Sequence, residues 1–503
     1  MHILGVDVGT TGTKAMAFDE NGRKVAQAYQ GYKLTTGANG FVEQNADDWL
    51  NALLFTVKSC AEETDGDIQA LSLSTQGGSM VPVDANRESL CPALSWMDMR
   101  SQREAEKLDK TKGSEWFYEK SGWSLSPALN AAKILWLKEY APNIYHKAWM
   151  YLTTLDYLNV KLTGEPVIDP TNAAITQLMN VRAGDWDDEI LDAACVSRAQ
   201  LPTILPPGHV VGALTKKIAE TVGLAPGTLV INGAHDQYCS AAGAGALHSG
   251  DTILSTGTAW VVLATTLKPH FDSATHIAVG PHVAHGKWGA LSSIPTAGVA
   301  MEWLREKLGF GGGNPANGIL SLQEIDKVLG QRSIYGNGLL FYPYFGGRGF
   351  PRNMLDMQAS IAGLTLKDDA FDIALAAMEG VVFELRLYIE AYQAIGIDVR
   401  NMRMMGGAAK SAFWTDIVAN AVGRPLIRLK EPDTACVGAA MLAGVGAGAF
   451  AGLENAFSKI GPDGDVCPVN AERKAHYDEK FEKYRRGLDS LENFYMKAGG
   501  NPT

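Results

Sequence analysis

Four short segments of the chain combine residue types that could bind phosphate or move a proton. The first is Asp7-Val8-Gly9-Thr10-Thr11-Gly12-Thr13-Lys14, which follows an apolar run. A carboxylate at the end of a buried strand is costly to desolvate unless something compensates, and a metal ion is the usual partner. The glycines and threonines can direct N–H groups and hydroxyls at an anion, and Lys14 adds positive charge. The segment indicates a metal-assisted phosphate site or, alternatively, a tight hairpin turn. It lacks the spacing of a Walker A loop.

The second segment, His235-Asp236-Gln237, follows an apolar run at 229–233. Phosphoryl transfer requires a positioned hydroxyl, a carboxylate that takes its proton, and neutralisation of charge. Asp236 could be that carboxylate. The alternative is an N-cap of the following helix, which the local sequence alone favours, although a helix start would also keep the carboxylate ionised. His235 could tune this base, but we expect it to make a structural hydrogen bond.

Two further segments are weaker when taken singly. Ser255-Thr256-Gly257-Thr258 could be a second phosphate loop or an ordinary strand end. The segment from Met404 to Ser411 contains Gly406-Gly407 after a strand-like run. Glycines there would let the backbone approach a flat ligand such as adenine. A plain strand-to-helix turn is the alternative.

Strand and helix patterns alternate along the chain, which predicts an α/β fold. The chain is expected to open as an antiparallel meander with a turn at 19–22. The strands that we expect are 2–8, 14–18, 24–29, 68–73, 229–233 and 252–255, with helices at 45–61 and 241–247. The order of strand, Gly/Thr loop and strand occurs twice, so two similar halves would each supply one phosphate loop.

The length of 503 residues exceeds what one hydrophobic core usually supports. We therefore expect two domains, 1–245 and 246–503, with the boundary in a Gly/Ala-rich stretch. The glycine loop Gly311–Gly318 is expected to be an exposed turn. The Ala/Gly-rich run Thr434–Phe450 lacks the bulky apolar residues of a membrane span, so a buried helix is expected there. A solvated C-terminal helix is expected at 472–486.

The charge and the cysteines limit the partners and the compartment. A net charge of -11 argues against nucleic acid and anionic membranes, which bind basic surfaces. The six cysteines contain no CxxC pair, which predicts free thiols in a reducing compartment. The N-terminus lacks the pattern of a signal peptide. These features together predict a cytoplasmic protein.

In their order and separations, the four segments resemble the FGGY carbohydrate kinases, and the match covers essentially the whole chain. The run from Ala359 to Gly380 is similar to the C-terminal signature of that family. The stretch Lys133–Glu139 is similar to its earlier signature, except that Asn130 stands where Pro, Ser or Thr is usual. The resemblance implies two ribonuclease-H-like domains of the actin/hexokinase type around a central cleft, with ATP and Mg²⁺ as cofactors. Homodimers are common in this family, but no interface can be identified from the sequence.

The resemblance also implies roles for single residues. Asp7 would help to hold Mg²⁺ through water, Asp236 would be the general base, and Gln237 would lie beside the sugar. The residues implied along the phosphates, ribose and adenosine of ATP are Thr10, Thr11, Lys14, Thr258, Gly298, Glu302, Gly407 and Ser411. Ser411 stands where glycerol kinases have Asn.

The acceptor is expected to be recognised by the loop Gln76-Gly77-Gly78. Xylulokinases carry Gln-Met-His there and glycerol kinases carry Gln-Arg-Glu. Two glycines would leave space or remove hydrogen bonds, which changes selectivity. We expect phosphorylation of a ketopentose such as D-xylulose. The alternatives are kinases of another ketose, polyol or aldonate (ribulose, erythritol, glycerol, gluconate) and, from another class, an actin-fold ATP-binding protein without metabolite kinase activity.

Overall fold

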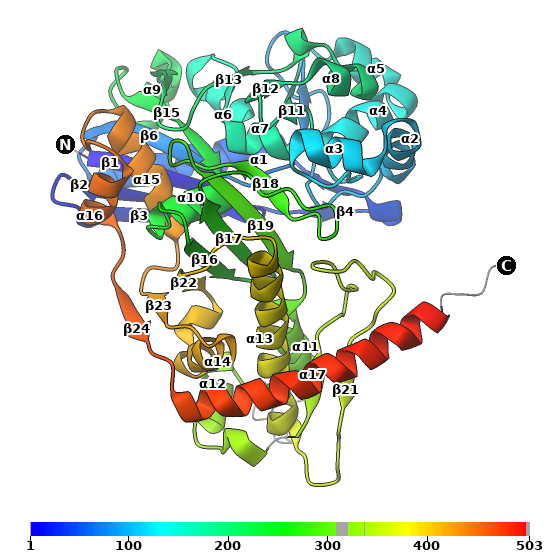
Figure 1. Cartoon of the computed structure of the whole chain (residues 1–503). Coiled ribbons are helices and arrows are strands. Elements are labelled where there is room, and N and C mark those ends of the chain that lie inside the picture. Colours follow the sequence, from blue (N-terminus) through cyan, green and yellow to red (C-terminus); the bar gives the residue numbers. More distant parts are fainter. Residues whose placement is uncertain (1, 308–319, 337, 499–503) are drawn as a thin grey trace.

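The computed structural model describes residues 2–307, 320–336 and 338–498 (Figure 1). The glycine loop expected at Gly311–Gly318 lies outside these residues. The described chain forms two α/β halves, each built on a large sheet of its own, which confirms the predicted fold class.

The sheet of the first half has the order β14-β15-β6-β1-β2-β3. Strands β1 (His2–Val8), β2 (Gly12–Asp19) and β3 (Lys24–Gly31) form the predicted antiparallel meander. Strand β6 (Ile68–Thr75) pairs with β1 in parallel, and β15 (Leu229–His235) pairs with β6 in parallel. Strand β14 (Val210–Ala213) closes the edge in the antiparallel sense.

Helices cover both faces of this sheet. Because successive strand residues point to opposite faces, Leu4 lies in one core with residues of α1 (Ala46–Glu63), and Ile3 lies in another core with residues of α10 (Asp236–Gly243). Coverage on both faces explains why these strands are almost continuously apolar. Further elements of this half are β7 (Val81–Val83), β8 (Ala93–Leu94), α4 (Asn130–Tyr140), α6 (Thr154–Thr163) and α7 (Pro170–Ile175).

The second half repeats the same strand plan. Its sheet has the order β18-β19-β17-β16-β22-β23-β24. The elements of this half are β16 (Asp251–Thr256), β17 (Trp260–Thr266), β18 (Ala278–Pro281), β19 (Trp288–Ile294), β22 (Asn401–Gly406), β23 (Leu426–Leu429), β24 (Gly464–Cys467), α11 (Ala297–Lys307), α12 (Leu322–Leu329), α13 (Ala370–Ala394), α14 (Ala412–Val422) and α17 (Ala471–Ala498). Strands β19, β17 and β16 form an antiparallel meander, and β22 and β23 follow in parallel. This repetition confirms the expectation of two similar halves.

Helix α15 (Thr434–Gly446) is the buried helix expected in the Ala/Gly-rich run. It lies between β23 and β24 of the second sheet in sequence but packs against β1, β6 and α10 of the first half. The approach is so close that a Cβ atom on Gly438 would lie 1.9 Å from the carbonyl oxygen of Cys239, and one on Gly5 would lie 2.0 Å from that of Cys436. The small residues are therefore a packing requirement.

The division of the chain near residue 245 stays a prediction.

Two expectations about helices need correction. Helix α10 begins at Asp236 and not at Ala241, because the polar residues after β15 turn directly into the helix. Helix α17 is not solvated on all sides, since Tyr477, Phe481 and Tyr484 are fully buried in the core of the second half.

Two other expectations can be compared with the described residues. All six cysteines are free, as predicted. In the described part of the chain, no helix is long and apolar enough to span a membrane.

Candidate active site

Three parallel strands of the first half end at one edge of the sheet, and the predicted polar residues meet there. In the register of the sheet, Asp7 of β1 pairs with Ser74 of β6, and Ser74 pairs in turn with Ala234 of β15. Asp7 therefore lies beside the strand ends that continue into Gln76 and Asp236. We call Asp7, Gln76 and Asp236 the carboxylate edge.

Asp7 is the residue expected to bind metal. Its Oδ1 accepts a hydrogen bond of 2.7 Å from the Ser74 hydroxyl. Burial, followed by the charges of Asp236 and Asp433, raises the pKa of Asp7 to about 7. A cation would relieve this repulsion. No group of three His, Cys, Asp or Glu side chains in the described ranges could hold a metal alone, but Mg²⁺ needs only one or two carboxylates beside water and phosphate. Asp7 therefore fits an Mg²⁺ site.

Lys14 and the loop between β1 and β2, where phosphate binding is predicted, lie next to Asp7. Lys14 forms an ion pair with Asp433, which directly precedes α15. Although burial opposes the charge, this pair raises the pKa of Lys14. Phosphate binding at Lys14 would therefore compete with Asp433.

Three hydrogen bonds fix the loop between β1 and β2. The Gln44 amide donates to the Thr10 carbonyl at 2.6 Å, and the Trp96 indole donates to the Thr10 hydroxyl at 3.1 Å. The carbonyl of Thr11 accepts from the backbone N–H of Tyr32 at 3.1 Å. Both threonines thus lie in a fixed hairpin turn, and phosphate binding by this turn stays a prediction.

Gln76 is connected to that loop through Gln44. The Gln76 amide donates to the Gln44 side-chain oxygen at 2.9 Å, and Gln44 then donates to Thr10. The Oε1 atoms of Gln76 and Gln237 are buried and have no hydrogen-bond partner. Buried polar atoms without a partner are rare and indicate that a ligand or water is needed.

The space expected beside Gly77 and Gly78 does not exist. A Cβ atom on Gly77 would lie 2.7 Å from the His235 ring, and one on Gly78 would lie 2.9 Å from the Leu129 side chain. Neighbouring side chains already fill the volume that the missing side chains would occupy. Of the two effects expected for these glycines, free space is not found next to their main chain, and the removal of hydrogen bonds stays a prediction.

Lys133 of α4 binds the main chain of the Gln76-Gly77-Gly78 loop. Its ammonium is fully buried and donates to the carbonyl oxygens of Gly78 at 3.0 Å, Leu94 at 3.1 Å and Ser95 at 2.7 Å. Burial lowers the pKa of Lys133 to about 7. Three converging carbonyls compensate for the buried charge and fix the loop main chain.

Asp236 is the first residue of α10, and His235 occupies the N-cap position. The N-cap role that the local sequence favours for Asp236 is therefore wrong. The Oδ1 atom of Asp236 is buried without a hydrogen-bond partner, and burial raises the pKa of this carboxyl to about 6. A carboxylate with a pKa near neutrality is suited to proton transfer.

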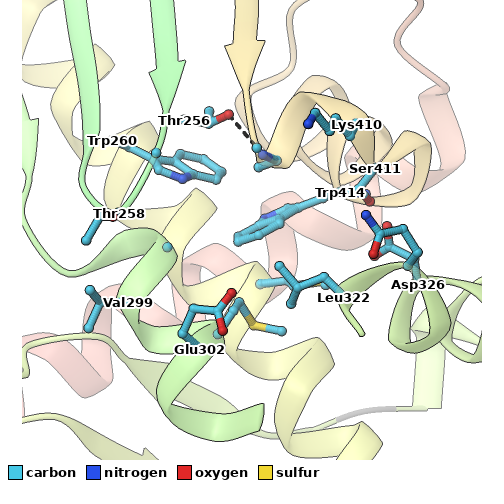
Figure 2. A pocket seen from close by; sticks show the side chains of 17 residues that line it. Thr256, Thr258, Trp260, Val299, Glu302, Leu322, Asp326, Lys410, Ser411 and Trp414 are labelled. Carbon is cyan, nitrogen blue, oxygen red and sulfur yellow. Dashed lines mark hydrogen bonds between the residues drawn. The ribbon is translucent and has the colours of Figure 1, made fainter. Parts of the chain in front are cut away.

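The second half contains a cavity of about 200 Å³ (Figure 2). The predicted residues Thr258, Gly298, Glu302, Gly407 and Ser411 all line it. We call it the tryptophan cavity, because Trp260 and Trp414 form part of its wall with ring centroids 5.0 Å apart. Figure 2 shows Glu302 near these rings and Ser411 beside Asp326.

Local contacts fix the lining of the tryptophan cavity. Ser411 caps α14 by accepting a hydrogen bond of 2.9 Å from the Trp414 amide. A Cβ atom on Gly298 would lie 2.2 Å from the Gly257 carbonyl oxygen, so α11 can approach the β16–β17 loop only with glycine at this position. The Glu302 carboxylate pairs with Arg305 at 2.6 Å.

Three residues of these sites were missed from the sequence. Gln44, Lys133 and Asp433 make the contacts described above with partners 32 to 419 positions away. Lys133 could have been singled out, because a lysine inside an apolar helical run needs acceptors. Gln44 and Asp433 give no such signal.

Comparison with known proteins agrees with this geometry. The profile of the FGGY family of carbohydrate kinases, N-terminal domain, matches residues 2–243, and that of the C-terminal domain matches residues 253–447. The chain belongs to the FGGY family of carbohydrate kinases. The resemblance drawn from the sequence is thereby confirmed.

Individual FGGY kinases are similar over nearly their whole length. A xylulose kinase from Bacillus subtilis (strain 168) is 26% identical over 96% of this chain and 96% of its own. A gluconokinase from the same organism is also 26% identical, over 94% of this chain and 93% of its own. The crystal structure of gluconate kinase from Lactobacillus acidophilus superposes with a TM-score of 0.90 at 26% identity and covers 99% of both chains. This likeness confirms the fold of two ribonuclease-H-like halves.

Proposed function

We propose that this FGGY kinase transfers the γ-phosphoryl group of ATP to a hydroxyl of a small sugar, with Asp236 as the general base. One observation carries the proposal. Asp236 has a buried, unpartnered oxygen and a pKa raised to about 6, and it stands at the sheet edge that also bears the phosphate loop. This carboxylate is suited to accept the hydroxyl proton as the phosphoryl group is transferred.

The other residues bind and orient. The tryptophan cavity would hold the nucleoside, and Thr10, Thr11 and Lys14 would contact the phosphates. When bound at Asp7, Mg²⁺ would neutralise charge on those phosphates. The buried amide oxygens of Gln76 and Gln237 would accept hydrogen bonds from hydroxyls of the acceptor.

For the acceptor, we propose a ketopentose such as D-xylulose. The support is that relatives named xylulose kinase are similar over almost the entire chain. An aldonate such as gluconate is the second candidate, because a relative named gluconokinase is equally identical. Ribulose, erythritol and glycerol are the remaining candidate acceptors.

The deciding experiment measures release of ADP in a coupled assay with ketoses, polyols and aldonates as acceptors. We expect one ketopentose to have the highest kcat/KM and expect almost no ADP release without an acceptor. Equal ADP release with and without acceptors would instead indicate an ATPase without metabolite kinase activity. If gluconate had the highest kcat/KM, the proposed acceptor would change from a ketopentose to an aldonate, and the proposed phosphoryl transfer from ATP would stand.

A cytoplasmic location and a homodimer belong to the same proposal. The location is supported by the six free cysteines, which fit a reducing compartment. A light-scattering mass in solution would test the dimer, and a monomer at micromolar concentration would contradict it.

A further inference from the structure

The imidazole of His235 lies where a side chain at position 77 would otherwise be. A Cβ atom on Gly77 would be 2.7 Å from Cδ2 and 2.8 Å from Nε2 of that ring, closer than real Cβ contacts. Gly78 has a φ of +75°, which itself favours glycine, but Gly77 is not among the residues with positive φ. The requirement for glycine at 77 therefore comes from its neighbours, chiefly His235, and not from the backbone.

The same imidazole contacts Asp236. Its Nε2 lies 3.2 Å from Asp236 Oδ1, and the His235 side chain is only 8% exposed. Burial lowers the pKa of His235 to about 4, although the charge of Asp169 opposes this. The ring is therefore neutral at pH 7, and the contact is not an ion pair. In the Nε2–H tautomer the ring presents one N–H group to Asp236 Oδ1, a buried oxygen that makes no hydrogen bond.

The surroundings restrict the ring to this place. The backbone N–H of His235 donates to the Thr171 hydroxyl at 2.8 Å, and the Tyr238 ring centroid lies 5.8 Å away. Nδ1 is buried without a hydrogen-bond partner, and the polar atom that the structure places beside Nε2 is Asp236 Oδ1.

We propose that His235 is a positioning residue that holds Asp236 against the Gln76-Gly77-Gly78 loop, and that Gly77 is glycine in order to admit this ring. The inference rests on the proposed function, since it assumes that Asp236 is the base. With Oδ1 held by His235, the second oxygen of the carboxylate takes the proton of the acceptor hydroxyl. One imidazole thus connects the loop that recognises the acceptor with the group that activates it.

A double-mutant cycle between positions 77 and 235 tests the proposal. In the full-length wild-type background we expect Gly77→Ala to lower kcat at least about tenfold, because the methyl group displaces the ring and small misplacements are costly in catalysis. In the His235→Ala background the same change should alter kcat by less than about twofold, since the obstacle is gone. Gly77→Ala should also lower the thermal midpoint Tm in the wild-type background and change it little in the His235→Ala background. This measurement does not depend on activity.

Conservative variants separate positioning from folding. His235→Gln can place an amide N–H near the Nε2 position and should restore part of kcat, whereas His235→Leu should not. Both should leave ATP affinity and acceptor KM nearly unchanged, so the loss falls on kcat. His282 is a matched control, because it is another buried histidine, whose Nδ1 accepts from the Ala284 amide at 3.0 Å. His282→Gln should lower Tm and leave kcat unchanged.

Each other outcome has a definite meaning. Equal costs of Gly77→Ala in both backgrounds, or full kcat in His235→Leu, would overturn the inference and leave the proposed function intact. No turnover of any acceptor by the wild-type protein would overturn the proposed function, and this inference with it.

Discussion

The carboxylate edge and the tryptophan cavity differ in how full they are. At the carboxylate edge, Asp7 and Asp236 are partly buried, and burial raises their pKa values to about 7 and about 6. Nearby side chains already occupy the volume beside Gly77 and Gly78. The tryptophan cavity instead has open room of about 200 Å³, bounded by two indoles, small residues and helix ends.

This difference separates two tasks of a kinase. Carboxyl groups with strongly raised pKa values are a mark of sites where chemistry occurs. A preformed cavity that combines apolar walls with polar groups such as Glu302, Asp326 and Lys410 is typical of ligand binding. We therefore expect changes at the carboxylate edge to reduce turnover, and changes at the tryptophan cavity to reduce nucleotide affinity.

The largest effect is expected for Asp236→Asn. Removal of the base should lower kcat by about 10²–10⁴-fold, the range that general base catalysis contributes. The affinity for ATP should stay nearly the same, because Asp236 does not line the tryptophan cavity. Steady-state kinetics and nucleotide titration measure the two quantities. Near-normal turnover would contradict the assignment of the base and the contrast between the two regions.

Lys133→Met should have the next largest effect. Three buried carbonyls would lose their donor, and each such loss costs about 1–3 kcal/mol. We expect the free energy of unfolding to fall by about 3 kcal/mol and the acceptor KM to rise, while ATP affinity stays constant. The control is Lys138→Met on the same helix, where the side chain is exposed and the effect should be within about 0.5 kcal/mol. Equal stability losses in both variants would argue against the carbonyl clamp.

The pH dependence of kcat/KM should follow Asp236. Because the base acts in its ionised form, the rate should fall as the pH decreases through about 6, where the raised pKa of this carboxyl lies. An ordinary aspartate would place this limb near 4. Rates measured between pH 4.5 and 8 with the best acceptor test this. An acid limb near pH 4 would show that Asp236 is less desolvated than the structure indicates.

The smallest effect is expected for Ser411→Ala in the tryptophan cavity. Loss of an N-cap costs about 1 kcal/mol, so Tm should decrease slightly and the KM for ATP should rise by a few-fold. The kcat value should not change. A large loss of kcat in this variant would show that the cavity also takes part in turnover.

Local patterns allowed much of the fold to be predicted. The meander, the helix after it and the repeat of strand, loop and strand follow from apolar runs, turn residues and helical spacing, and all of them appear in the structure. The start of α10 was placed too late, since Asp236 and Gln237 interrupt the apolar pattern that marks a helix.

A site residue could be predicted only where its type and its place after a strand indicate a chemical role. An aspartate after a strand can be recognised, but the contact between Gly77 and His235 joins residues 158 positions apart and leaves no local trace. The same holds for Lys14 with Asp433. Free space was one of the two effects expected for the glycines, because a sequence does not show which side chain fills the volume beside another residue.

The position of α15 also has a consequence for biosynthesis. This helix ends at residue 446, 203 positions after the end of α10 at residue 243 (446 − 243). At about 5–20 residues per second, a ribosome needs roughly 10–40 s to produce that interval. During this time Ile3, Met16 and Phe18, which later pack in one core with α15, have no covering helix from the second half. The nascent first half therefore has only α10, and not α15, in this core until synthesis is nearly complete.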